Sequence, residues 1–399
     1  MKAPVKTTAN ERAMMKNSRL RVTKFLAPRT AMQGLTIIEL LISMVLGLTL
    51  AAGVTQVYVG NSQIARDQEA RAQMQENGRF ATSFLANELR MAGYLGCLAS
   101  LEAADINSTL ASPPASFQPT VGLQGWEASG TAPGVAYSST EDVAVTSTAA
   151  GWVTSGGNVL DVTNAMPGSD IVRAWSAAGI GATINTITPG ATTVVNSGVL
   201  DIVAGDILLL SDCERAEWVQ ACEVEDVGGG VSINAVLSSG CVPGNDTTVR
   251  VATEVGGELA KLQGTVFYIG KRGDVATNPP ALFRRELSAT AIAGTAEELV
   301  EGIESMQIQF GMNADNDNKK SVDSYVVANQ VTDWSRVVSV RVSLLVQSIE
   351  DNMLPAPQAY TFNGVTYDGE AGNGALPEDT RLRRVFTTTI TLRNRAVGS

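Results

Sequence analysis

The chain has 399 residues, 44% of them hydrophobic, so it is long enough to bury a sizeable core in one to three domains. Residues 1–34 carry eight Lys or Arg and one Glu, a charge of +7, so the total net charge of −11 leaves −18 on residues 35–399. The acidity of residues 35–399 excludes bulk electrostatic binding to nucleic acid. The sequence contains no His, which excludes the commonest general base and the commonest zinc ligand.

An apolar segment runs from Leu35 to Val59, directly after the basic residues. As a helix it would span roughly 37 Å, more than the hydrocarbon core of a bilayer at about 30 Å. The basic flank predicts that the N-terminus stays in the cytoplasm while the acidic remainder crosses the membrane. Glu39 lies within this segment, where a carboxylate is rare and indicates a function. The alternative is that Glu39 lies at the interface and reaches water.

The start of this segment, Gly34 to Glu39 (GLTIIE), resembles the class III signal of type IV pilins and pseudopilins. The resemblance implies that a prepilin peptidase cuts between Gly34 and Leu35, which removes residues 1–34 as a leader, and methylates the new N-terminus at Leu35. It further implies that Glu39, with Thr36 in the same assembly segment, meets the free amine of a neighbouring subunit. Leu35 departs from the usual Phe but is equally apolar and bulky.

An ordinary secretory signal is the main alternative, because a basic flank and an apolar run also precede signal cleavage. The small residues Ala51, Ala52 and Gly53 would then form the cleavage site. Glu39 inside the apolar run counts against that interpretation, as does the helical pattern that continues past these residues. Met14 or Met15 is an alternative start of the chain.

Residues 60–97 are more polar and are expected to continue the helix as its amphipathic half. Phe84, Leu85, Leu89 and Ala92 recur at spacings of three and four, which places them on one face. No Pro interrupts Leu35–Leu95, so the pattern predicts one helix of up to about 90 Å. Gly93 and Gly96 mark its expected end. The segment 90–97 resembles the same region of the PilW family of minor type IV pilins.

Residues 98–260 are expected to form a β-rich middle region, inserted into the fold. Short β-branched runs between turn residues predict strands at Asp142–Thr148, Asn158–Thr163, Asp170–Trp175, Thr192–Asn196 and Asp206–Leu210. Residues 217–224 and 231–236 suggest a hairpin. The segment 205–213, a buried strand that leads into Cys213, again resembles the PilW family.

Residues 261–399 are expected to form the C-terminal β-sheet region of the head. The predicted strands are Gly264–Gly270, Ala281–Leu287, Glu304–Phe310, Arg336–Val346 and Arg384–Leu392. Residues 338–344 alternate between apolar and polar, the period of a half-buried antiparallel strand. Segments 299–307 and 384–390 resemble the PilW C-terminal region. The predicted fold is therefore α+β and type IV pilin-like, with a long N-terminal helix on an antiparallel β-rich head.

Four cysteines, Cys97, Cys213, Cys222 and Cys241, would lie outside the cytoplasm, where thiols oxidise. Their spacing alone leaves three pairings open. The family resemblance places cysteines at Cys97 and Cys213 and so implies that these two pair, which leaves Cys222 to pair with Cys241.

Two further patterns suggest sites. Asn313, Asp315 and Asp317 alternate like the ligands of a calcium loop, but Asn318 occupies the usual Gly position and Ser324 replaces the bidentate Glu, so an acidic surface turn is the favoured interpretation. The C-terminal arginines are expected on solvated strand faces that pair with the acidic head, and a DNA or partner patch is the alternative. They are Arg381, Arg383, Arg384, Arg393 and Arg395.

No nucleophile elbow, phosphate loop, dinucleotide fingerprint or metal spacing occurs, so we expect neither an enzyme nor a cofactor. The resemblance implies a minor pilin that helps to prime or assemble a type IV pilus, at its tip. Its implied partners are the major pilin, other minor pilins, prepilin peptidase and the assembly platform of the inner membrane. It would begin as a single-pass protein of a Gram-negative inner membrane, with a periplasmic head, and end outside the cell in the pilus. The alternatives are a minor pseudopilin of a type II secretion system and a tip subunit that binds DNA or a surface.

Overall fold

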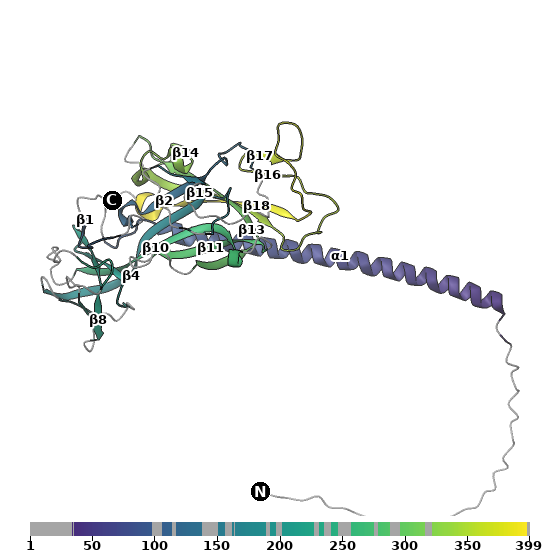
Figure 1. Cartoon of the computed structure of the whole chain (residues 1–399), viewed down its shortest axis with the longest axis horizontal. Coiled ribbons are helices and arrows are strands. Elements are labelled where there is room, and N and C mark those ends of the chain that lie inside the picture. The colour runs from purple at the N-terminus through teal and green to yellow at the C-terminus, as the bar shows by residue number, and fades with distance from the viewer. Residues whose placement is uncertain are drawn as a thin grey trace, which may run out of the picture. The chain divides into compact units, whose positions relative to one another are not determined.

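The structure is a computed structural model of the chain. It describes residues 34, 36–97, 106–113, 117–137, 151–155, 162, 164–188, 192–196, 202–226, 231–234, 241–245, 257–274, 278–287, 296–315 and 321–396. The chain divides into two compact units, Met1–Asn61 and Ser62–Ser399. Helix α1, Ile37–Arg90, is continuous through the division (Figure 1). The architecture is α+β, with one long apolar N-terminal helix and a β-rich body.

In the first unit, the helix presents apolar side chains on all its sides. Every large apolar side chain from Ile37 to Val59 exposes between 49% and 82% of its surface. Within the described residues, α1 is the one helix that is long and apolar enough to cross a membrane. Because exposed apolar surface of this extent is unfavourable in water, these side chains require lipid or another protein around them.

In the second unit, the helix packs on the body through one face. Met74, Gly78, Ala81, Leu85 and Leu89 are buried at spacings of three and four residues. All of these except Gly78 join the main core, to which strands of both sheets contribute. The stripe expected from the sequence is present, although its first member, Phe84, is only partly buried, at 6.3 Å from the ring of Phe267.

Gly78 packs directly against a side chain of the smaller sheet, Phe386. A Cβ added there would overlap the ring of Phe386. Although Ala favours a helix over Gly by about 1 kcal/mol, we expect Gly78→Ala to lower the unfolding free energy by about 1–2 kcal/mol, because the ring must shift. Urea unfolding of the full-length chain in detergent, followed by Trp fluorescence, measures this. Gly151→Ala, where an added Cβ meets nothing within 4 Å, is the control. A more stable Gly78→Ala chain would contradict the prediction.

The helix ends at Arg90, five residues before the expected Leu95. Gly93 and Gly96 adopt the left-handed backbone, with φ of 77° and 71°, which glycine tolerates and other residues avoid. The Gly93 amide donates a hydrogen bond of 2.7 Å to the carbonyl of Trp175, so the chain leaves the helix by pairing with the body.

Within the described residues, twelve strands form the larger sheet, with the path β1-β7-β6-β10-β4-β5-β9-β8; β11 and β12 continue from β10, and β2 and β3 continue from β4. The strands are β1 (Ile106–Ser108), β2 (Leu123–Ala128), β3 (Trp152–Val153), β4 (Ile171–Thr188), β5 (Thr192–Asn196), β6 (Ile207–Ser211), β7 (Ala216–Gln220), β8 (Glu223–Asp226), β9 (Val231–Asn234), β10 (Glu258–Lys271), β11 (Pro280–Leu287) and β12 (Ala296–Glu301). All pairings are antiparallel except β1 with β7.

The middle and C-terminal regions share this sheet, because β4 and β10 pair along most of their length. The boundary expected between residues 260 and 261 falls inside β10, so it does not separate two structural units. Strands predicted at 170–175 and 264–270 are only parts of β4 and β10.

The smaller sheet has the order β14-β13-β15-β18 in the described part of the chain, and a separate hairpin pairs β16 with β17. Their bounds are β13 (Ile303–Met312), β14 (Ser324–Val326), β15 (Val337–Gln347), β16 (Tyr360–Phe362), β17 (Val365–Tyr367) and β18 (Arg383–Thr391). The short helices are η1 (Pro119–Val121), η2 (Arg272–Asp274), η3 (Ala328–Gln330), η4 (Trp334–Arg336) and α2 (Arg393–Ala396). The C-terminal strands predicted from the sequence coincide with β11, β13, β15 and β18 to within two residues.

The hairpin expected from residues 217–224 and 231–236 is present as the antiparallel pair β8–β9, but its first strand begins at Glu223, because residues 216–220 form another strand. Strand β7 pairs with β6, and a separate strand, β8, pairs with β9. Strands β7 and β8 are separated by Ala221 and Cys222. The Ala221 amide donates to the carbonyl of Asp206, and Cys222 is held in a disulfide. The strand expected at 142–148 lies outside the described residues, as does the one at 158–163 except for Val162.

Candidate functional site

The first turn of α1 is capped by Thr36. The Glu39 amide donates to the Thr36 hydroxyl at 3.3 Å, and the Leu40 amide donates to the Thr36 carbonyl at 3.2 Å. A Thr followed three residues later by Glu is the sequence signature of a capping box. Thr36 and Glu39 have this spacing, and the helix begins directly after Thr36. Gly34 is exposed, and Leu35 lies outside the described residues.

Glu39 is an exposed acid among exposed apolar side chains. It stands in the first turn, where the helix dipole favours a negative charge. Among the described residues, no ion pair involves its carboxylate. The carboxylate is therefore accessible to a group from another molecule that approaches the start of the helix.

The structure contains two disulfides, Cys97–Cys213 and Cys222–Cys241, the pairs that the family resemblance implied. Cys97 follows the end of α1, and Cys213 follows β6, so the first bridge joins the helix exit to the larger sheet across 116 residues. The Cys97 amide also donates to a carboxylate oxygen of Glu258 at 2.9 Å. The second bridge closes a local loop, since its cysteines are 19 positions apart in the sequence.

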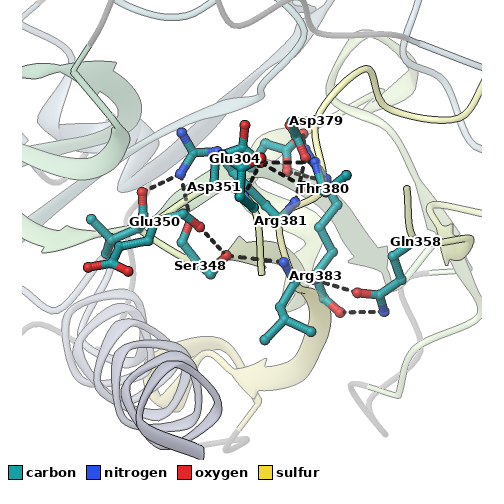
Figure 2. A network of polar contacts seen from close by, with 12 residues as sticks. Glu304, Ser348, Glu350, Asp351, Gln358, Asp379, Thr380, Arg381 and Arg383 are labelled. Carbon is teal, nitrogen blue, oxygen red and sulfur yellow. Dashed lines mark hydrogen bonds and ion pairs between the residues drawn. The ribbon is translucent and has the colours of Figure 1, made fainter. Parts of the chain in front are cut away.

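Between β15 and β18 the chain leaves the smaller sheet as an arm, Ser348–Leu382, which carries the β16–β17 hairpin. The arm closes at its base: the Ser348 amide donates to the Leu382 carbonyl at 2.9 Å, and the Leu382 amide donates to the Ser348 hydroxyl at 3.1 Å. Figure 2 shows the polar side chains gathered at this base. Arg381 reinforces it by donating to the carbonyls of Ser348 and Ile349.

Arg383 is the centre of this base. Its guanidinium contacts Glu304 at 2.7 Å and Asp379 at 2.6 Å, and its side chain is only 1% exposed. Burial favours the neutral acid at Asp379, but hydrogen bonds from the Arg383 side chain and the Arg381 amide outweigh it and lower the pKa of Asp379. The Gln358 side chain also bonds both the amide and the carbonyl of Arg383 (Figure 2).

The C-terminal arginines therefore differ from one another, which the expectation of solvated strand faces did not allow for. Arg383 does pair with acids, but it is buried rather than solvated. Arg384 and Arg393 are exposed, and the side chain of Arg395 lies outside the described residues. The partner Glu304 is 79 positions away in the sequence, so no local pattern could have identified this pair.

The tip of the arm docks on the body through Asn363. The side-chain amide of Asn363 donates to the Thr131 carbonyl at 2.7 Å and to the side-chain oxygen of Gln307 at 3.0 Å. The main-chain carbonyl of Asn363 accepts from the Gly134 amide at 2.9 Å. The Tyr367 hydroxyl accepts from the Tyr137 amide at 3.2 Å. The arm is thus fixed at its base and at its tip.

A second buried acid joins the two sheets. The carboxylate of Asp170 accepts from the amide of Ala128, in β2, at 2.9 Å and from that of Ile308, in β13, at 2.8 Å. Burial, followed by the charge of Glu127, raises the pKa of Asp170. Burial also raises the pKa of Glu127 to about 7.

The raised pKa values of Glu127 and Asp170 predict that the stability of the head depends on pH. Because the folded-state pKa of Glu127 is raised to about 7, its contribution to stability is complete below its unfolded pKa and is lost as the pH rises through 7. We expect the unfolding free energy to fall by roughly 2 kcal/mol between about pH 5 and pH 8. Urea unfolding of the full-length chain in detergent measures it. Glu127→Gln should reduce the fall and leave the part that is due to Asp170, whereas the exposed control Glu370→Gln should leave the whole fall; an equal fall in both variants would contradict the assignment.

The proposed calcium loop is closed by a residue that the sequence pattern did not select. The Asp323 carboxylate accepts from the amides of Ala314 at 2.7 Å and Asp315 at 3.4 Å. Asn313 is buried, and Asp317 lies outside the described residues. Within the part of the chain that the structure describes, no three or more His, Cys, Asp or Glu side chains are grouped to hold a metal ion.

Comparison with known proteins places the C-terminal region in context. The family model of type IV pilus-assembly protein W matches residues 266–394. This stretch runs from within β10 to α2 and contains the smaller sheet, the arm and its base; segments 90–97 and 205–213 lie outside it. No curated protein matches the chain. With a candidate membrane helix at its N-terminus, the match supports a protein of a type IV pilus-assembly family that is compatible with membrane anchoring.

Proposed function

We propose that the chain is a minor type IV pilin of PilW type, with a pilin-like fold, which prepilin peptidase processes and which joins the pilus at or near its tip. One combination of observations carries the proposal. An exposed apolar helix begins at Ile37, within a class III-like motif, Gly34 to Glu39, and the same chain matches the pilus-assembly family over residues 266–394.

The exposed half of α1 fits two successive environments. Its apolar side chains are covered by lipid in the precursor and by neighbouring helices in the filament. Since lipid tails are as apolar as the side chains of a helix bundle, moving between the two yields little hydrophobic free energy. Packing and polar pairs must therefore decide whether the helix leaves the membrane.

Glu39 is the polar group that could form such a pair when the helix moves from the membrane into the filament. Cutting after Gly34 creates a free amine at Leu35, which is absent from the uncut chain. A carboxylate and an amine at about 4 Å attract by about 4 kcal/mol, before desolvation, at an effective dielectric constant near 20. Processing thus provides the partner for Glu39 of another subunit and makes assembly conditional on cleavage.

In this proposal the head lies in the periplasm and residues 1–34 lie in the cytoplasm. The basic charge of those residues supports this orientation, and the two disulfides suit an oxidising compartment. The arginine and carboxylate groups of the head hold its own elements together, so we assign it a structural role, without catalysis or cofactor. Its partners would be the major pilin, the other minor pilins and the assembly platform.

The test is to shear filaments from cells that carry the chain and to search the filaments for its peptides. We expect head peptides, such as those from residues 296–347, at far lower abundance than the major subunit, and few filaments when the gene is deleted. Filaments that form in normal number without the chain, and that never contain its peptides, would contradict the proposal.

A further inference from the structure

Strand β18 is an edge of the smaller sheet in the described part of the chain. It pairs with β15 from Arg383 to Thr391, without a register shift, and it ends the order β14-β13-β15-β18. Its other side pairs with no described strand. A strand in this position has a row of amides and carbonyls available to another chain.

Hydrogen bonds at its two ends show which main-chain groups face outward. The Leu392 amide donates to the carbonyl of Val338, so the even-numbered residues of β18 bond to β15. The Gln358 side chain bonds both the amide and the carbonyl of Arg383, so the odd-numbered residues face away. Gln358 occupies the place that the peptide group of an added strand would take, and no other described residue makes such a contact with Thr387 or Thr389.

This edge lacks the usual features that prevent pairing. Natural edge strands carry Pro, Lys, a bulge or a cover. Residues 385–391 read VFTTTIT, with high β propensity, no charge and no Pro. Thr387, Thr389 and Thr391 are all exposed. An edge of this kind is suited to strand addition by an extended segment.

A groove lies beside the same strand. Its volume is about 710 Å³, and it is bounded by helix α1 on one side and by Thr388 on the other. Phe80 lines it and leaves 53% of its surface exposed. Glu76 and Arg79 also line it, with opposite charges. The groove has room for the side chains of a strand whose backbone pairs with β18.

We propose that β18 and this groove bind an extended segment of another protein, which adds to the smaller sheet as a further strand and carries acidic residues at its ends. The exposed cations determine this chemistry. Arg384 lies near one end of the strand, and Arg393 lies just beyond the other, while the middle is uncharged. The inference concerns a surface that the proposed pilin function leaves unspecified, and it stands without that function.

A second copy of this chain suits the edge poorly. In the antiparallel registers that oppose Thr387 and Thr389 of two copies, Arg393 of each copy lies within three residues of the position opposite the exposed Arg384 of the other. Like charges in such positions destabilise a strand pair. A partner strand with glutamate or aspartate at its ends meets the same positions with attraction.

Amide hydrogen exchange of the full-length chain in detergent micelles tests whether the edge is open. We expect fast exchange at Thr387 and Thr389 and at least about tenfold slower exchange at Phe386 and Thr388, which bond to β15. Slow exchange at all four positions in the isolated chain would show that the edge is already covered, and would overturn the proposal.

A peptide tests the occupant. The probe is a fluorescent seven-residue peptide of alternating valine and threonine with a glutamate at each end, and the comparison peptide has lysine at both ends. We expect binding of the glutamate peptide at least about tenfold tighter than that of the lysine peptide, with slower exchange at Thr387 and Thr389 on binding. Equal affinity for the two peptides, or no binding of either, would overturn the proposal.

Two substitutions test whether the peptide binds at the edge of β18. Thr387→Pro removes an outward amide and leaves the bonds to β15 intact, so it should weaken binding about tenfold or more, whereas Thr387→Val, which keeps the amide, should not. Arg384→Glu should reverse the preference toward the lysine peptide. Concentration-dependent self-association that Thr387→Pro abolishes would identify a second copy as the occupant and would overturn the proposal as stated.

Discussion

A Glu39→Gln chain is expected to be exported and cut like the natural chain but to be at least about tenfold depleted from sheared filaments. The change removes the charge that would attract the new amine, and that attraction is worth about 4 kcal/mol before desolvation. It leaves the Glu39 amide, which bonds to the cap residue Thr36, in place. Immunoblots of membranes and of sheared filaments, together with the intact mass of the protein, measure the outcome.

Two controls separate assembly from anchoring. Glu69→Gln changes another exposed acid of α1, in the part that belongs to the body, and should join filaments normally. The amount of Glu39→Gln chain in the membrane fraction should equal that of the natural chain, because removing a charge from an apolar helix does not weaken its insertion. Normal amounts of the Glu39→Gln chain in filaments would exclude the proposed role of the charge.

Replacing Arg383 with methionine is expected to lower the unfolding free energy of the head by about 3–5 kcal/mol. Methionine keeps much of the volume, but it leaves Glu304 and Asp379 buried without the cation that they share. Arg384→Met, one position along the same strand, changes an exposed arginine and should cost about 0.5 kcal/mol or less. Urea unfolding of the full-length chains in detergent compares the two.

Further substitutions identify the cause of this loss. If it arises from unpaired acids, then adding Glu304→Gln and Asp379→Asn to Arg383→Met should recover part of the stability. Because the pKa of Asp379 is lowered, its contribution is present above its unfolded pKa, near 4, and should disappear as the pH falls further. Equal costs for Arg383→Met and Arg384→Met would contradict the view that the base of the arm depends on this ion pair.

Local patterns predicted the elements whose environment is uniform along their length. Helix α1 was predictable because apolar residues fill its first half and recur every three or four positions in its second. Strand β15 was predictable because apolar residues alternate along its sequence, but it is not half-buried as expected: nine of its eleven residues are buried, and only Arg341 and Ser343 are partly exposed. The end of the helix was placed too late because it depends on a hydrogen bond from Gly93 to Trp175, a residue 82 positions away.

Long-range pairing could not be predicted in the same way. Strand β4 extends to Thr188 because β10 pairs alongside it, and β10 in turn begins before the boundary assigned between the two regions. The buried contacts of Arg383 with Glu304, and of Asp170 with Ile308, join segments that carry no mark of each other in the sequence. The cap at Thr36, in contrast to these long-range pairs, could be predicted, because its sequence signature is local.

The central claim is that α1 stays on the protein after cleavage and serves first as an anchor and then as a packing surface. The mature N-terminus, read by mass spectrometry of protein taken from membranes and from filaments, tests this most directly. The account predicts a chain that begins at N-methylated Leu35. A chain that begins near Ala52, released without the apolar half of the helix, would contradict it.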